Sequence, residues 1–361
     1  MTEKSTSITA EWVEHVATGG AVLGGGGGGS PTEGIEFGLF AVEYGNPEVI
    51  QLDALETSET VLTVSAVGAP AATESHVDPS DYVRATERLV DRLADRGEPV
   101  GALMTNEMGG FASVNGLVQS AVTGLPLVDA ACNGRAHPTG PMGSIGLDGE
   151  TTTLQAAVGG RPDTEYEHEL VVEARLRRAA ATVRRTATAA GGLVAVARNP
   201  VSAGYASDNA AVGVYDQAES IGRDVVDAED GRVAAGRVAD RLDGEVVTVG
   251  TVESKRLETN DGFDVGEVTV DGHRMTLWNE YMTLDHDGTR LATFPDLIAT
   301  LNADTGQPVS TAAVSEGDTV AVLTASASAL TLGAGMTDPE LFEPVERAVG
   351  KDVTGYGSTE D

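Results

Sequence analysis

The sequence predicts an α/β protein: an N-terminal domain with a mainly parallel sheet and flanking helices precedes a β-rich C-terminal domain. Two patterns support this prediction. Over residues 60–131, short apolar segments alternate with amphipathic helical segments, as in parallel sheets that helices cover on both faces. From about residue 245, β-like segments follow one another with Asp-Gly turns between them. The 361 residues suffice for two domains.

The predicted elements follow the chain in order. Helices are expected over 9–20, 79–99, 112–125, 167–192 and 213–230. Thr9 is the expected cap of the first helix, which Gly19 and Gly20 end, and Ser80 is the expected cap of the second. Strands are expected over 60–70, 100–105, 126–131 and 193–201. We place the first domain at 1–240, the β-rich domain at 241–335, and a C-terminal helix with a disordered tail at 336–361.

Six consecutive glycines, at 24–29, precede the sequence Ser-Pro-Thr-Glu. Ser30 and Glu33 form a capping-box pattern and Pro31 suits the first helical position, so a helix is expected to begin where the glycines end. The N-terminus of a helix has free N–H groups and a positive dipole end, which favour an anion. We therefore predict a structured, ligand-facing loop, against the alternative of a tight turn without a ligand. The substrate-binding residues expected in this loop are Gly26, Gly27, Gly28, Gly29 and Ser30.

The net charge of the chain makes some classes of partner unfavourable and indicates the solvent conditions in which the protein works. Lys and Arg number 23 against 56 Asp and Glu, a net charge of −33, which makes nucleic acids and anionic membranes poor partners. An acidic, lysine-poor surface resembles that of proteins from salt-in halophiles such as haloarchaea. No apolar run is long enough to span a bilayer and the N-terminus lacks a signal-peptide pattern, so we expect a cytoplasmic protein. The single cysteine fits a reducing compartment. Assembly into a homo-oligomer is left as an open alternative.

Polar residues follow two neighbouring predicted strands, in the segments "NEMGG" and "DAACNGRAHPTG". They are the residue types needed for acid–base catalysis, for a nucleophile and for oxyanion stabilisation. They also lie at strand ends, where ligands of parallel sheets bind. The candidate catalytic residues are Glu107, Asp129, Cys132, Arg135 and His137. The remaining candidate substrate-binding residues are Asn106 and Asn133 and, in the segment "LWNEYM", Asn279 and Glu280.

Several candidates have a structural alternative. Asp129 could tie down a loop, Cys132 could be a buried filler, and Arg135 could clamp a carboxylate. A metal site is the weaker functional alternative, in which Cys132, His137 and a carboxylate would bind Zn²⁺ and leave a position open for water. We expect no cofactor, with Zn²⁺ as the alternative.

A series of motifs occurs in one order over about residues 10–335, namely "GAVLGGGGGGSP", "VGAP", "EMGG", "GLPLVDA" with "GRAHP", "GRDVVDA", "WNEYM" and "TFPDLIATLNADTGQPV". In these motifs the chain resembles the S-methyl thiohydantoin desulfurase-like family. The resemblance implies an α/β domain, a separate β-rich domain, and hydrolysis of a hydantoin-like five-membered ring. In the named activity, water replaces a methylthio group. The positions that match the family pattern are Asp129, Gly134, Arg135 and Pro138. Ala131 in place of an acidic residue and His137 in place of an aromatic one mark a distinct branch.

Three functions are consistent with these features. The first is a hydrolase of the C–S or C–N bond in a small cyclic amide or thioamidine, with water activated by Asp129, Glu107 or His137, or with Cys132 as nucleophile. Arg135 and the glycine loop would stabilise the charged intermediate. The second is a non-enzymatic protein that binds a small anion or metabolite. The third, a nucleotide-binding enzyme, has weak support, because six glycines satisfy G-x-G-x-x-G trivially and no G-K-[ST] follows.

We expect the fold to lose stability as KCl is removed, because the excess carboxylates repel one another once screening is lost. The midpoint of urea unfolding, measured by circular dichroism at a series of KCl concentrations, should rise with salt. A midpoint that does not depend on salt would show that the acidic surface carries no repulsion that screening relieves.

Overall fold

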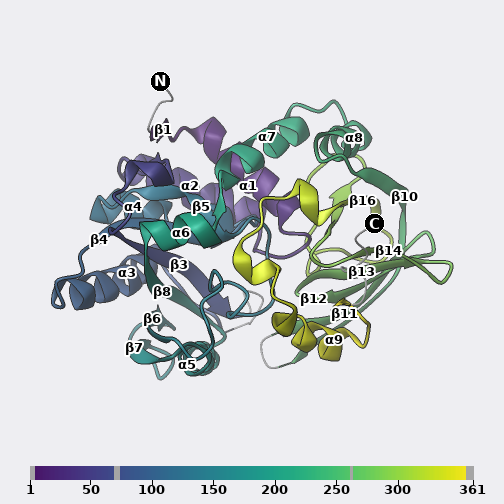
Figure 1. Ribbon diagram of the computed structural model, residues 1–361. Helices are drawn as coiled ribbons and strands as arrows, with labels where there is room; N and C mark the ends of the chain where they lie inside the picture. The colour runs from purple at the N-terminus through teal and green to yellow at the C-terminus, as the bar shows by residue number, and fades with distance from the viewer. Residues whose placement is uncertain (1–4, 69–73, 261–262, 355–361) are drawn as a thin grey trace.

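The computed structural model describes residues 5–68, 74–260 and 263–354 and has two parts, each built on one β-sheet (Figure 1). The N-terminal half carries a sheet with parallel strands and helices on both faces, and the C-terminal half carries an antiparallel sheet. This is the predicted fold class. Among the described residues, no helix combines the length and the apolar character that crossing a bilayer requires.

Parallel strands form the middle of the N-terminal sheet. In spatial order they are β2 (Glu48–Ile50), β5 (Leu127–Asn133), β4 (Val100–Glu107) and β3 (Thr60–Gly68). Antiparallel strands complete the sheet, namely β1 (Ser5–Ser7), β6 (Thr152–Gly159), β7 (His168–Arg175), β8 (Leu193–Ser202) and β9 (Ala211–Val212). The carboxyl ends of β3, β4 and β5 therefore lie along one edge.

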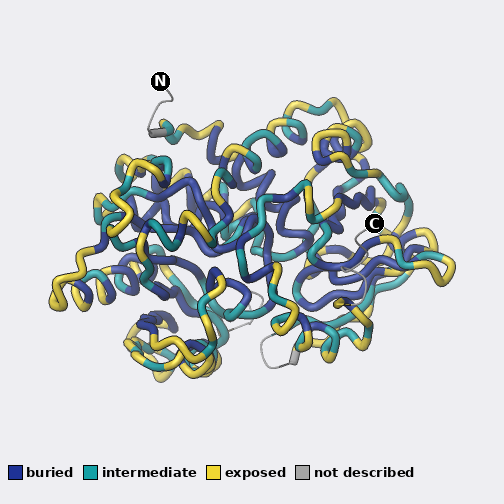
Figure 2. Tube along the Cα trace, viewed as in Figure 1, coloured by how far each residue is buried: buried dark blue, intermediate teal, exposed yellow. Residues whose placement is uncertain are grey.

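Helices cover this sheet on both faces, so the middle strands are buried (Figure 2). The largest apolar core holds α1 (Ala10–Leu23), α2 (Pro31–Tyr44), α3 (Pro79–Ala94), α4 (Leu117–Thr123) and α7 (Val214–Val226). Two smaller apolar clusters lie on the other face, with α5 (Leu176–Ala189) and α6 (Ala203–Asn209). This double cover explains why the parallel strands are apolar along their whole length.

The C-terminal half is a curled antiparallel sheet. Its strands, in spatial order, are β14 (Thr289–Thr293), β13 (Glu280–His286), β12 (His273–Trp278), β11 (Phe263–Val270), β10 (Glu245–Asn260), β16 (Thr319–Ala325) and β15 (Leu297–Asn302). Irregular pairing bends the long strand β10, and β15 also contacts β13 and β14, so the two ends of the sheet approach each other. The helix α8 (Gly231–Arg241) packs on β10 and β16. The last segment crosses between the halves to α9 (Glu343–Val349), which contacts β12 (Figure 1).

The first helix does not end at Gly19 and Gly20, as the sequence predicted, but continues to Leu23. The two glycines lie where α1 crosses its neighbours closely. A Cβ atom on Gly19 would come within 1.8 Å of the carbonyl oxygen of Ala218 in α7. The two glycines therefore allow close packing of the helices and do not end α1.

The helix predicted over 167–192 is wrong in its first part. His168–Arg175 is the strand β7, in which exposed and half-buried residues alternate, and α5 begins at Leu176. Alternation with a period of two is the pattern of a strand at the edge of a sheet. The helix predicted over 112–125 is shorter, because a 3₁₀ turn at Ala112–Val114 precedes α4.

The cap predicted for the second helix is also displaced. α3 begins after Asp78, not Ser80, and Asp78 and Asp81 form a reciprocal capping box. The helix expected near the C-terminus is α9, whereas the tail predicted to be disordered, at 355–361, and the end of the predicted strand, at 69–70, lie outside the described residues. The domain boundary at 240 stays a prediction, since the largest apolar core draws residues from both halves.

One buried arginine joins the two halves. Arg135, in the loop after β5, is fully buried, and its Nη1 donates to the carbonyl oxygen of Pro295 at 2.9 Å and to that of Asp296. Its guanidinium group lies 4.5 Å from the centre of the Phe294 ring. Burial lowers the pKa of Arg135 to about 10, so the group stays charged at neutral pH. Arg135 is therefore a clamp, but one that holds backbone carbonyl groups.

We expect Arg135→Met to lower the free energy of unfolding by about 3 kcal/mol, because both carbonyl groups lose their charged donor. Urea unfolding in concentrated KCl measures the change. Arg92→Met, at an exposed position of α3, is the matched control and should change stability by less than about 0.5 kcal/mol. Equal effects of the two substitutions would contradict the role of Arg135 as a clamp.

Candidate active site

A cavity of about 970 Å³ lies between the two halves. The N-terminal half contributes the glycine loop, the carboxyl ends of β3 and β4, and one side of α5, and the C-terminal half contributes the start of β13 and residues 310–312. Its wall is apolar with a few polar groups, as in sites for small molecules. The predicted site residues that line it are Gly26, Gly27, Gly28, Gly29, Ser30, Asn106, Glu107, His137, Asn279 and Glu280.

Backbone hydrogen bonds fix the glycine loop against both halves. The carbonyl oxygens of Gly25 and Gly26 accept from the N–H groups of Tyr281 at 2.9 Å and Thr311 at 3.0 Å, in the C-terminal half. The carbonyl oxygen of Gly28 accepts from two N–H groups in the turn after β4, each at 3.0 Å. The loop is thus structured, as predicted, and it lines the cavity, whereas its role in binding a ligand stays a prediction.

The loop ends at a helix start, also as predicted. Ser30 caps α2, since its Oγ accepts from the N–H group of Glu33 at 3.4 Å. Within the described residues, the N–H groups of Gly28 and Gly29 have no hydrogen-bond acceptor. Both residues line the cavity, and free backbone N–H groups at a helix start suit an oxyanion.

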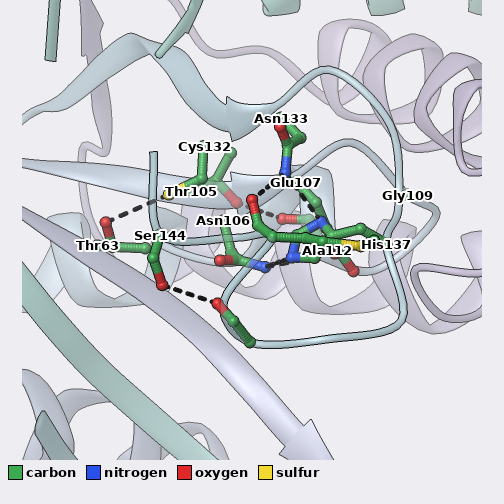
Figure 3. A network of polar contacts seen from close by, with 12 residues as sticks. Thr63, Thr105, Asn106, Glu107, Gly109, Ala112, Cys132, Asn133, His137 and Ser144 are labelled. Carbon is green, nitrogen blue, oxygen red and sulfur yellow. Dashed lines mark hydrogen bonds and ion pairs between the residues drawn. The ribbon is translucent and has the colours of Figure 1, made fainter. Parts of the chain in front are cut away.

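Glu107 and His137 form the polar centre of the cavity (Figure 3). Nδ1 of His137 lies 3.0 Å from Oε2 of Glu107, and Nε2 of His137 lies 3.3 Å from Nδ2 of Asn106. The same Nδ2 atom donates to Oε2 of Glu107 at 3.3 Å. Arg198, on β8, donates from Nη2 to Oδ1 of Asn106. Nδ2 of Asn133 lies 3.2 Å from Nδ1 of His137, so five side chains form one connected network.

The network indicates where the imidazole proton lies. Because a guanidinium group only donates, Oδ1 of Asn106 faces Arg198 and the amide Nδ2 faces Nε2 of His137, which accepts from it. Nδ1 of His137 faces Oε2 of Glu107 at 3.0 Å and Nδ2 of Asn133 at 3.2 Å. Since this Nδ2 also donates to the carbonyl oxygen of Met142, we infer that the ring proton is on Nδ1 and points to the carboxylate of Glu107. The His137 ring and the Asn106 amide both meet Oε2, and Oε1 of Glu107 has no hydrogen-bond partner in the described part of the chain. Oε1 is left for a ligand or a water molecule.

A second glutamate reaches the cavity from the C-terminal half. Glu280, the first residue of β13, is 3% exposed, and its Oε2 has no hydrogen-bond partner among the described residues. Burial raises the pKa of Glu280 well above its usual range, the nearby Glu107 raises this pKa further, and Arg135 lowers it in part. The surroundings of Glu280 therefore favour its neutral form more than those of an exposed glutamate do.

Positive charge collects on the α5 side of the cavity, where Arg177, Arg184 and Arg198 line the wall. Arg184 lies 4.1 Å from the centre of the Phe263 ring, and Arg198 is 4% exposed. Burial lowers the pKa of both, and repulsion by Arg198 lowers the pKa of Arg184 further. In the described residues, no carboxylate forms an ion pair with any of the three. This side of the cavity favours a negative group on a ligand.

Asp129 and Cys132 do not line the cavity. Oδ1 of Asp129 accepts from the N–H group of Tyr215 at 2.9 Å, in the first turn of α7, and its Oδ2 accepts from Gln51. Cys132 lies in an apolar cluster, 3.5 Å from Oγ1 of Thr63, and burial raises the pKa of its thiol to about 11. The structural alternatives, a tie for a helix start and a buried filler, fit these surroundings.

The two protein ligands of the predicted zinc site have different surroundings, since Cys132 lies in an apolar cluster and His137 lines the cavity. The described ranges contain no cluster of three or more His, Cys, Asp or Glu side chains that could hold a metal ion. Asn133, also outside the cavity wall, donates to the carbonyl oxygen of Met142 at 2.9 Å and supports the loop after β5.

Arg184 and Arg198 were missed by the analysis of the sequence. Arg198 had a detectable signal, because it interrupts the apolar strand segment "LVAVARNPV", and a charged residue in such a strand needs a buried partner. Arg184 had no such signal in the sequence, because the helix over 176–189 carries several arginines and only the helix face that each one occupies distinguishes them.

The fold and the cavity define a two-part α/β protein with a small-molecule site between its halves. Family models match over most of the chain, the S-Me-THD-like N-terminal domain over residues 11–166 and the S-Me-THD-like C-terminal domain over residues 175–341. The chain belongs to the S-Me-THD-like family, as its motifs suggested. The comparison with curated proteins finds no match. The crystal structure of a structural-genomics protein from Chromobacterium violaceum has the same fold, with 20% sequence identity, a TM-score of 0.71, and coverage of 95% of this chain and 96% of that chain.

We expect Gly28→Ala to disrupt the glycine loop, because Gly28 has a φ of +76° and its Cβ atom would lie 2.5 Å from Cα of Gly109. Gly124→Ala is the matched control, since Gly124 has a φ of +73° but no atom within 4 Å of the added Cβ. Both variants carry the backbone strain of about 1 kcal/mol, and Gly28→Ala should lose about 2 kcal/mol more from crowding. Equal losses of unfolding free energy in the two variants would show that the loop can shift to accommodate the added Cβ atom without losing stability.

Proposed function

We propose that the protein is a cytoplasmic hydrolase of a small five-membered ring, a cyclic amide or thioamidine such as a hydantoin or an S-methyl thiohydantoin. The observation that carries this proposal is Glu107, a carboxylate on the cavity wall with one oxygen held by two donors and the other without a partner in the described residues. Membership of the S-Me-THD-like family supports a reaction of the desulfurase or hydrolase type.

Glu107 is the general base of the proposed reaction. Its Oε1 takes a proton from water while the water oxygen attacks the ring carbon that bears the sulfur or nitrogen. The Nδ1–H group of His137 and the amide of Asn106 hold Oε2, so the carboxylate keeps one orientation during the attack. A new C–O bond forms and the C–S or C–N bond then breaks, with no change of oxidation state.

Negative charge develops on a heteroatom of the ring when water adds. The free N–H groups of Gly28 and Gly29 and the guanidinium group of Arg198 are the donors that stabilise it, and preorganised donors of this kind contribute about 3 kcal/mol each. Arg198 takes the role that the sequence assigned to Arg135, because Arg135 does not line the cavity and is engaged with backbone carbonyl groups.

A protein that binds a small anion without turning it over is the second candidate. Arg184 and Arg198, without a carboxylate partner in the described residues, and the free N–H groups of the glycine loop would suffice for such binding. Binding of an anion alone would not require His137 to orient Glu107, so we prefer the hydrolase.

We expect the folded protein in concentrated KCl to release methanethiol from S-methyl thiohydantoin, with ring opening of plain hydantoin as the parallel assay. Glu107→Gln should lower kcat about 10²- to 10⁴-fold and change KM little, because the amide keeps the size of the side chain but takes no proton. Glu43→Gln, at an exposed position of α2, is the control and should keep the activity of the unsubstituted protein.

Two results would count against this function. No turnover of either ring by well-folded protein would withdraw the reaction and leave the binding protein as the better candidate. Turnover that Glu107→Gln leaves intact would keep the reaction and remove Glu107 as its base.

A further inference from the structure

The cavity contains a second carboxyl group that the proposed attack of water does not use. Glu280 enters from the C-terminal half, with its Oε2 buried and without a hydrogen-bond partner in the described residues. Its side chain packs on the glycine loop, where a Cβ atom on Gly27 would lie 2.3 Å from Oε1. A polar group so deeply buried without a partner is costly, and in a cavity wall it indicates a ligand that completes its hydrogen bonding.

The charged groups around Glu280 do not balance a carboxylate. Arg135 is the cation that acts on it, but Arg135 donates to the carbonyl groups of Pro295 and Asp296, and no ion pair joins it to Glu280 within the described ranges. Glu107, on the N-terminal side, repels a negative charge at Glu280. Desolvation and this repulsion act in the same direction, and both raise the pKa of Glu280.

We propose that Glu280 is the proton donor of the site and works opposite Glu107, an inference that rests on the hydrolase function proposed above. As water adds under Glu107, the carboxylic acid of Glu280 gives its proton to the departing sulfur or ring nitrogen. The C–S or C–N electron pair stays with the leaving atom, which departs as a neutral thiol or amine. Glu280 is then a carboxylate, and the proton that Glu107 took from water restores it through solvent after the product leaves.

The two glutamates differ in the way that acid–base pairs in active sites differ. Glu107 is oriented by His137 and Asn106 and keeps a free oxygen for water, whereas Glu280 has no donor on its free oxygen and lies in a dry wall. Pairs of titratable groups whose surroundings favour opposite protonation states mark the base and the acid of a site.

The first test compares leaving groups in Glu280→Gln, which keeps the size of the side chain but has no acidic proton. With S-methyl thiohydantoin, kcat should fall about 10²-fold or more. With the S-nitrophenyl analogue, whose thiolate leaves without a proton, the variant should keep most of its kcat. The unsubstituted protein should lose activity at alkaline pH as Glu280 loses its proton, and the variant should not show this loss. Glu258→Gln, at an exposed position of β10, is the control and should behave as the unsubstituted protein with both substrates.

The second test needs no turnover. Infrared difference spectra between the unsubstituted protein and Glu280→Gln should show the carbonyl stretch of a protonated carboxylic acid at neutral pH, and this band should disappear when the pH is raised. Circular dichroism and the urea midpoint of the variant establish that it is folded.

The outcomes separate the two proposals. Equal losses of kcat with the methyl and nitrophenyl substrates, or absence of the carboxylic acid band, would overturn the proton donor while the hydrolase function stands. Absence of turnover of any of these rings by the unsubstituted protein would overturn the hydrolase function and the proton donor with it. A selective loss with the methyl substrate together with the band would support both.

Discussion

At the cavity, the two halves of the protein meet on a short strip of backbone without side chains. The carbonyl groups of Gly25 and Gly26 reach the N–H groups of the C-terminal half, and that of Gly28 reaches the turn after β4. Such contacts need glycine, because an added Cβ atom would collide with Glu280 of the C-terminal half at Gly27 and with Gly109, in the turn after β4, at Gly28. The glycine loop therefore sets how closely the two sheets approach, and the shape of the cavity between them depends on it.

That approach explains why two glutamates of one cavity differ chemically. Glu107 ends the strand β4, where Asn106 of the same strand and His137 of the loop after β5 lie against its carboxyl group. Glu280 comes from the other sheet, where it is buried and its Oε2 has no donor in the described residues. Burial raises the pKa of Glu280. Their surroundings, rather than their residue type, therefore distinguish the proposed base from the proposed acid.

Several features were predicted correctly because they depend on neighbours in the sequence. The start of α2 follows from Ser30 and Pro31, and the parallel strands follow from apolar segments that alternate with helices. The errors have the opposite origin. Glycines that stop a helix in isolation instead allow α1 to cross α7 closely. The segment 168–175 is a strand because it pairs with the preceding strand β6 at one end of the sheet, and this pairing overrides its local similarity to the helix that follows.

The sequence by itself determined the fold class, the family, the acidic surface and the two clusters of candidate residues, since these depend on composition, local patterns and the order of motifs. Only the tertiary structure decided which candidates share a cavity. Asp129, Cys132 and Glu107 all follow or lie in adjacent strands, yet Asp129 holds the start of α7, Cys132 fills an apolar cluster, and Glu107 alone among them lines the cavity. Arg198 and Glu280 acquire their roles only there, because burial and the charges of distant segments set the state of a side chain, and neither is visible from its sequence neighbours.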